Sequence, residues 1–191
     1  MKKFFIHIFV LTYLAFFIGH LSLVKAEYVL PYPSYMPGNK IYSVSRMMDK
    51  LKNYWYWGTI AQIKYHLSLS DKYLVEAKTL FEYKQYLLAA DALSRSDAAL
   101  FGISELLDKG TNENKHMSQY EQLIYDAMVV HQEKLEGMKE LLPSEFIWTP
   151  EKKDATNLQI EQMLDESISI RNKIINELQG RMQLFTHNTY L

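Results

Sequence analysis

Cysteine is absent from the 191 residues of this chain. Disulfide bonds, thiol catalysis and cysteine-ligated zinc or iron–sulfur sites are therefore excluded. Glycine is scarce, at 7 residues, and the sequence has no glycine-rich loop of the kind that cradles phosphates. The G-x-S-x-G and H-E-x-x-H motifs of common hydrolases are also missing. These absences favour a binding or structural protein over an enzyme, and no cofactor is expected.

The sequence also has no long run of charge of either sign. Lysine and arginine number 21 against 22 aspartates and glutamates. Nucleic-acid-binding domains carry a basic footprint, so a nucleic-acid partner is not expected. Hydrophobic residues make up 48% of the chain, which is typical of one modest globular domain.

The N-terminal 26 residues have the pattern of an export signal. Two lysines precede an uncharged apolar run from Phe4 to Val24, and Ala26 closes a segment with a plausible cleavage pattern. The run is also about as long as the ~20 residues that span a bilayer, so residues 4–24 as an uncleaved membrane anchor are the alternative interpretation. Both interpretations predict that the remainder works outside the cytoplasm, either secreted or membrane-anchored through the N-terminus.

Residues 27–42 are rich in proline and tyrosine, and we expect an extended linker there. A short amphipathic helix should follow, with its apolar positions at Val44, Met47, Met48, Leu51 and Trp55. The next helix is expected to begin at Thr59, which forms a capping-box pattern with Gln62. One stripe at spacings of three and four runs along this helix, as in bundles and coiled coils: Ile60, Ile63, Leu67, Ser70, Leu74, Ala77 and Phe81.

We predict a helix break near Tyr83, because an unbroken helix to Leu107 would be unusually long. The following helix, which begins around Leu88, is expected to end at Gly110. Ser118 and Glu121 form a second capping-box pattern at the start of a helix that Pro143 should stop.

Thr149, Pro150 and Glu151 are typical of a further helix start, and apolar spacing then continues to Phe185. No strand-like alternation is evident. The expected fold is all-α, a four- to five-helix bundle that comprises residues 43–109 and a C-terminal helical hairpin, residues 115–185.

Residues 36–95 contain a series of motifs in a fixed order. They are Pro37-Gly38, Ile41-Tyr42, the basic Arg46 and Lys50, the aromatic Tyr54 to Trp57, Leu74-x-Glu76-Ala77, and Ala89 with Ala92-Leu93. This order resembles a family of exported bacterial helical domains of unknown function. The sequence departs from that family at Asn39-Lys40 and in having no glycine near Tyr83 to Gln85. The resemblance implies export and a helical bundle, and it brings no catalytic residues.

The consecutive aromatic residues Tyr54, Trp55, Tyr56 and Trp57 are the candidate ligand contact. Exposed rings of this kind stack on sugars or lie at a membrane interface. The alternative is packing at a helix–turn–helix corner, although four consecutive rings cannot all point inward.

A metal site is a weaker candidate. Glu113-x-x-His116 has a spacing used in di-iron bundles, but no second copy of the motif occurs. His131 lies on an apolar stripe and is more typical of a core histidine.

The sequence therefore predicts an exported, non-enzymatic helical module of the bacterial cell envelope. We expect a protein partner in the envelope or self-association, together with membrane association through residues 4–24. The alternative is a ligand-binding protein, with a glycan at Tyr54–Trp57 or a metal at His116 and His131.

Overall fold

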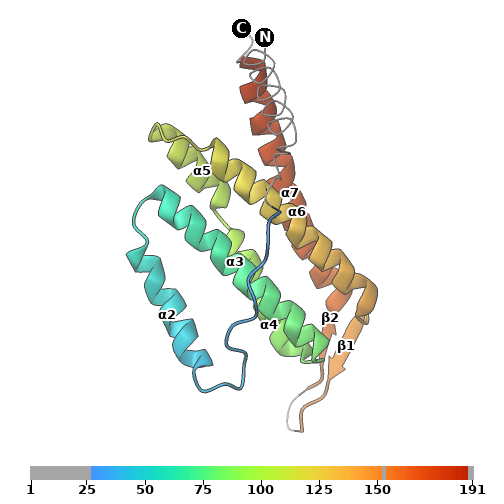
Figure 1. Ribbon diagram of the computed structural model, residues 1–191. Helices are drawn as coiled ribbons and strands as arrows, with labels where there is room; N and C mark the ends of the chain where they lie inside the picture. Colours follow the sequence, from blue (N-terminus) through green and yellow to red (C-terminus); the bar gives the residue numbers. More distant parts are fainter. Residues whose placement is uncertain (1–26, 152–153, 189–191) are drawn as a thin grey trace, which may run out of the picture.

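Helices account for most of residues 27–151 and 154–188, the ranges that the computed structural model describes (Figure 1). In chain order the elements are α2 (Tyr42–Trp55), α3 (Thr59–Glu82), α4 (Tyr86–Leu100), α5 (Ile103–Asn112), α6 (Ser118–Leu141), β1 (Glu145–Trp148), β2 (Thr156–Gln159) and α7 (Ile160–Asn188). Within these ranges no helix is both long and apolar enough to cross a bilayer. The predicted signal or anchor, residues 1–26, lies outside the described ranges.

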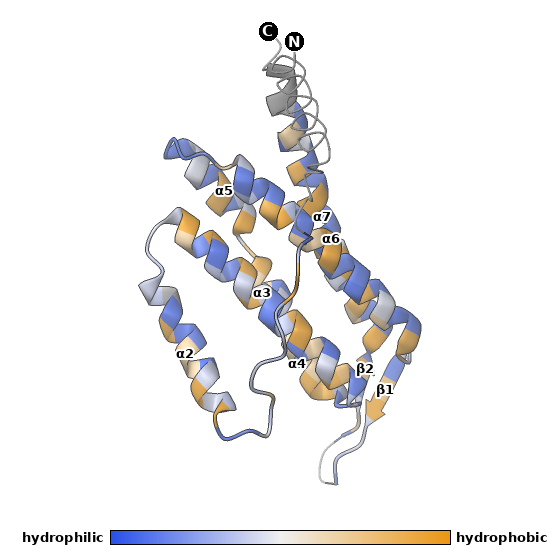
Figure 2. Ribbon diagram, in the orientation of Figure 1, coloured by the Kyte–Doolittle hydropathy of each residue, from blue (hydrophilic) through white to orange (hydrophobic). Residues whose placement is uncertain are grey.

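The helices pack in pairs. The most extensive contacts join α3 to α4 and α6 to α7, while α5 covers one end of α3 and α2 lies along its outer side (Figure 1). Hydrophobic and hydrophilic residues are interspersed along the long helices, as expected of helices that have one apolar and one polar face (Figure 2). The mostly helical fold predicted from the spacing is confirmed.

The buried apolar side chains form two clusters. We call the first the α5-end cluster; its buried residues include Ile63, Leu67, Leu100, Ile103, Leu107, Ile124, Met128 and Leu178. The second, the hairpin-end cluster, includes Leu74, Leu80, Phe81, Leu93, Leu135, Met138, Ile160 and Leu164. Each fully buried side chain of this size stabilises the fold by about 1.5–3 kcal/mol relative to exposure.

The predicted break near Tyr83 is confirmed, and the residue that makes it is a lysine. Lys84 has a φ of 58°, the left-handed conformation usually taken by glycine at the end of a helix. The amide of Gln85 donates to the carbonyl of Leu80, which closes the turn between α3 and α4. The missing glycine therefore did not prevent the turn.

The prediction of one helix from about Leu88 to Gly110 is wrong. The chain breaks at Phe101 and Gly102, where Gly102 has a φ of 79°. Gly110, expected to end a helix, lies inside α5, and a Cβ atom at this position would collide with the side chain of Met117. Its small size serves close packing rather than helix termination.

The predictions that the sequence contains no strand and that a helix starts at Thr149 are also wrong. β1 and β2 pair antiparallel, with Phe146 opposite Leu158, and α7 begins only at Ile160. Phe146 packs against Tyr86 at a ring-centroid distance of 4.6 Å. Because a two-stranded hairpin is marginal alone, this contact with the bundle is what holds it.

Two helix starts are predicted at the right residue for the wrong reason. α3 begins at Thr59 and α6 at Ser118, but neither N-terminus has a side-chain cap. The Thr59 hydroxyl donates instead to Glu113 Oε2 at 2.7 Å. Glu121 is buried rather than folded back as a cap, and burial raises its carboxyl pKa.

The proline-rich segment before α2 has no regular secondary structure, turns at residues 37–41 and is partly bound to the bundle. Leu30 and Met36 pack against the hairpin-end cluster. The Tyr28 side chain contacts the α5-end cluster, and its hydroxyl donates to Asp71 Oδ2 at 2.5 Å. The linker predicted at residues 27–42 thus acts as a strap across the bundle.

Candidate functional site

α2 is attached to the bundle through its polar side. Asp49 is the centre of this contact: its carboxylate pairs with Lys72 and accepts a hydrogen bond from the Tyr73 hydroxyl at 3.3 Å. The Tyr65 hydroxyl donates to the backbone carbonyl of Asp49. Burial, with the negative charge of Asp49 next, raises the pKa of Tyr73 to about 12, so this phenol remains a donor at neutral pH.

A second polar contact joins the start of α2 to α3 and α4. The Tyr42 hydroxyl donates to Glu76 Oε1 at 2.6 Å, and Arg95 Nη1 donates to the Tyr42 oxygen at 3.0 Å. Glu76 is only 2% exposed, with Arg95 Nη1 3.5 Å from its carboxylate. Glu76 is therefore a buried acid with Arg95 as its cation. The nearby Lys72 pairs with Asp49 instead.

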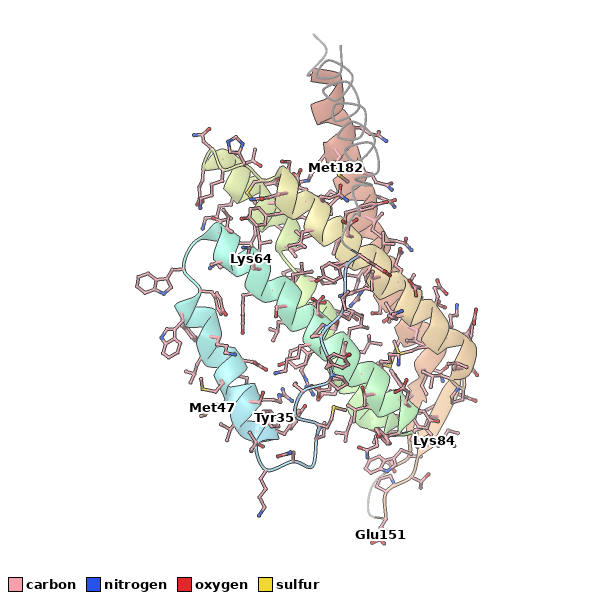
Figure 3. The ribbon with its side chains drawn as sticks, viewed as in Figure 1. Tyr35, Met47, Lys64, Lys84, Glu151 and Met182 are labelled. Atoms are coloured by element: carbon pink, nitrogen blue, oxygen red, sulfur yellow. The ribbon has the colours of Figure 1, made fainter. Side chains whose placement is uncertain are left out.

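Four of the five positions of the predicted apolar stripe of α2 therefore face away from the bundle, and Met48 is half-buried. Val44 is 52% exposed, Met47 56%, Leu51 47% and Trp55 76%. Met47 lies on the outer side of α2, whereas Tyr35 of the strap lies on the side of α2 that faces the bundle (Figure 3). A helix normally buries such a stripe, so α2 presents to solvent the face expected to be hidden.

The aromatic residues continue this exposed surface around the end of α2. Tyr54 is 77% exposed and Trp57 83%, and the Trp57 indole donates to the carbonyl of Tyr54 at 2.6 Å. Tyr56 alone has an inward partner, since its ring stacks on Tyr65 at 4.8 Å. We call the surface formed by Val44, Met47, Leu51, Tyr54, Trp55 and Trp57 the α2 face.

Exposed lysines lie beside the α2 face, at positions 40, 50 and 52, whereas Arg46 is half-buried and pairs with Asp91 of α4 at 3.8 Å. From Lys40 to Trp57 the chain has four basic residues, Lys40, Arg46, Lys50 and Lys52, and one acidic residue, Asp49. Asp49 is paired with Lys72 of α3. Lys50 and Lys52 are exposed. The segment is thus cationic, although the whole chain has a net charge of −1.

The residues suggested as metal ligands do not converge. His116 is exposed before α6, whereas His131 is buried within α6, fifteen positions further along a chain that rises about 1.5 Å per helical residue. Glu113 bonds to Thr59 and Lys115 rather than to His116. Across residues 27–151 and 154–188, no group of three or more acidic or histidine side chains is placed to hold a metal.

A buried polar layer separates the two apolar clusters. It takes residues at the same level from four helices and consists of Ser70 and Asp71 of α3, Ser96 and Asp97 of α4, His131 of α6, and Ser167 and Arg171 of α7. Only His131 was singled out as a candidate from the sequence. A serine on the apolar stripe of α3, at position 70, was the other available signal.

Arg171 is the central cation of this layer. Its side chain is fully buried, and its guanidinium pairs with Asp97 while donating to Ser96 Oγ at 2.9 Å and to Ser167 Oγ at 2.7 Å. The Ser96 hydroxyl in turn donates to the carbonyl of Ser70 at 2.9 Å. One guanidinium therefore joins α4 to α7, and its contact with Ser96 extends the connection to α3.

His131 and Tyr28 meet at Asp71. The His131 Nε2 atom lies 2.8 Å from Asp71 Oδ1, and the Tyr28 hydroxyl donates to the other carboxylate oxygen. Burial lowers the pKa of His131, and burial together with Asp71 raises the pKa of Tyr28. His131 is thus neutral at neutral pH, with its proton on Nε2 toward the carboxylate.

The layer does not have the geometry of a nucleophilic site. The free ring nitrogen of His131, Nδ1, is buried and has no hydrogen-bond partner among the residues the structure describes. Nucleophilic catalysis by serine needs a hydroxyl hydrogen-bonded to that nitrogen and open to substrate. His131 is 0% exposed, so the layer is a structural element.

Comparison of the chain with protein-family models, with curated proteins and with solved structures gave no match. The resemblance to exported helical domains therefore stays a prediction. Among residues 27–151 and 154–188, the α2 face stands out because its apolar side chains are exposed while the polar side of the same helix is bound to the bundle.

Proposed function

We propose that the chain is an exported, non-enzymatic helical module of the bacterial cell envelope that docks onto another envelope component through the α2 face. The observation that carries this proposal is the outward orientation of α2. Its polar side is bound to α3, while its apolar stripe and two tryptophans stay in water. A contiguous apolar surface rimmed by polar groups is typical of an interaction site.

Exposure of this stripe is unfavourable for the isolated protein. Each square ångström of apolar surface left in water forgoes about 25 cal/mol, so a sequence selected only for stability would turn the stripe inward. The specific contacts of Asp49 and Tyr42 prevent that rotation. The arrangement is understandable if a partner covers the stripe. Export is supported by the sequence pattern of residues 1–26.

Site-specific photocrosslinking tests the proposal. The full chain is expressed in cells with a photoreactive residue in place of Leu51, and the control carries it in place of Phe101, which is 87% exposed and lies between α4 and α5. We expect adducts to protein or lipid from position 51 in the envelope fraction and few from position 101. Equal yields at the two positions, or none at 51, would contradict docking through α2.

Glycan binding at Tyr54, Trp55 and Trp57 is the second candidate. It is favoured by the exposure of all three rings, because sugars stack on exposed aromatic faces. The test is binding of cell-wall glycan by the full chain with Trp55→Ala and Trp57→Ala. Glycan retention equal to that of the unchanged protein would eliminate this candidate, whereas loss of binding would support it.

A further inference from the structure

We infer that the component covering the α2 face is a lipid surface with anionic headgroups. This inference rests on the proposed function, because it names the partner of the same face. In this arrangement α2 lies in the plane of the membrane interface, with its apolar stripe among the acyl chains and its bound side toward α3.

The first support is the shape of the stripe. At 3.6 residues per turn, Val44, Leu51 and Trp55 fall within about 40° of one another around the helix. Lys50 and Lys52 lie on opposite sides of this line, about 120° and 80° from its centre. A narrow apolar stripe flanked by lysines, whose long side chains can reach headgroups, is the pattern of an interfacial amphipathic helix.

The second support is the aromatic end of α2. Tyr54 and Trp55 in the last turn of α2, and Trp57 just after it, are mostly exposed. Trp and Tyr are enriched where hydrocarbon meets water, because each combines an apolar ring with a polar group. The Trp57 indole is already bonded to the carbonyl of Tyr54, which fixes its ring at the end of the helix.

The third support is charge, and it also argues against a second copy of the chain. The segment from Lys40 to Trp57 has four basic residues and one acidic residue. The acidic one is paired with Lys72 and Arg46 is paired with Asp91, which leaves the exposed Lys40, Lys50 and Lys52 as the excess positive charge. Two such segments face to face would repel each other. An anionic lipid surface instead attracts each lysine and arginine near it.

The fourth support is position in the chain. The apolar run that ends at Val24 comes shortly before the strap, and α2 begins at Tyr42. An extended chain spans at most about 3.3–3.6 Å per residue, so residues 27–41 cover no more than about 50 Å, and the strap contacts of Tyr28 and Leu30 keep this segment on the bundle. If the run stays in a membrane, α2 remains within reach of the same bilayer.

Tryptophan quenching by brominated lipid tests this inference on the full chain. The chain has three tryptophans, so Trp148→Phe leaves Trp55 and Trp57 as reporters. The protein is reconstituted into vesicles of acyl-chain-brominated phosphatidylcholine, either pure or with one third phosphatidylglycerol. Residues 4–24 are present in both preparations, so the difference between them reports on α2.

We expect several-fold stronger quenching with phosphatidylglycerol than without it, and a decline as salt is raised. Lys50→Glu with Lys52→Glu should remove most of the difference. The matched control, Lys109→Glu with Lys173→Glu, changes two exposed lysines on α5 and α7 and should retain it. Leu51→Ser should lower quenching in both kinds of vesicle.

Quenching that is absent in both preparations, or equal in both, would overturn the inference. If quenching fails in this way but position 51 still forms protein adducts in cells, docking through α2 stands and the partner of the face is a protein. Failure of both measurements would instead overturn the proposed function itself.

Discussion

The buried polar layer and the underside of α2 use the same chemistry in opposite settings. Around Arg171, charged and hydroxyl groups are enclosed between two apolar clusters and hold the packed helices in register. Around Asp49, similar groups hold a single helix against the outside of the bundle, with its apolar side in water. The polar contacts of the layer are supported by apolar packing on both sides. Those around Asp49 hold α2 almost alone.

The difference shows that an amphipathic pattern does not decide which side of a helix is bound. α3 buries its apolar stripe, whereas α2 binds by its polar side because Asp49 and Tyr42 meet a lysine, tyrosines and Glu76 there. We therefore expect damage to the layer to unfold the protein, and damage to the α2 contact to release one helix. The following predictions test that contrast.

The largest effect is expected for Arg171→Met. Removal of the guanidinium leaves Asp97, only 19% exposed, without its cation, and breaking a buried pair in this way costs about 3–5 kcal/mol. The measurement is the free energy of unfolding in urea. Arg181→Met is the control, because its partners Asp108 and Glu177 are 61% and 35% exposed and such pairs contribute about 0–1 kcal/mol each. Equal losses in the two variants would contradict a special role for the layer.

Tyr28→Phe should have the next largest effect. The change removes the hydroxyl that donates to Asp71, and hydrogen bonds to charged groups contribute about 1.5–3 kcal/mol. Tyr32→Phe, on the same strap but almost fully exposed, should leave the unfolding midpoint unchanged. If the two variants behave alike, the strap does not stabilise the bundle through this bond.

His131 should make stability depend on pH. Its pKa in the folded protein is lowered by burial, so below the ordinary value of about 6.5 the unfolded chain binds a proton that the folded chain does not. Stability is complete above that value and falls with decreasing pH, at no more than about 1.4 kcal/mol per pH unit. In urea titrations from pH 8 to acid, His131→Gln should have a shallower decline than the unchanged protein. An identical pH profile would contradict this assignment.

Asp49→Ala should have the smallest effect on global stability, but it should clearly weaken the attachment of α2. Without the carboxylate, α2 loses its contacts with Lys72 and Tyr73, so its amides should exchange with solvent faster while those of α3 and α4 are unchanged. Leu51→Ser, on the exposed side of the same helix, should leave both exchange and stability within about 0.5 kcal/mol of the original. Uniformly faster exchange in Asp49→Ala would mean that α2 belongs to the cooperative core.

Much of the helical layout follows from local patterns in the sequence. The stripe of α3, the break near Tyr83 and the stop before Pro143 all appear where spacing and backbone chemistry place them. The hairpin was not predicted because its strands have four residues each, and only Phe146 and Leu158 make the inward pair. A pattern that short is indistinguishable from a loop until the bundle supplies a surface.

The sites were harder to predict because they too depend on contacts that form only in the folded bundle. The aromatic run was visible in the sequence, but the exposure of Trp55 and Trp57 depends on which side of α2 is bound. Arg171 and Asp97 are 74 residues apart and meet only in the folded bundle. Ser70 and His131 were both visible as polar residues on apolar stripes, but a polar level shared by their two helices was not predicted from them.

The position of Arg171 also constrains how the chain is made. Synthesis proceeds from the N-terminus, so Asp97 is added 74 residues before the arginine that neutralises it. At about 5–20 residues per second that interval is roughly 4–15 seconds. During this time the strap, α3 and α4 exist without the cation of their shared layer, and the carboxylate of Asp97 can remain hydrated. The buried polar layer can therefore be completed only after α7 has been synthesised.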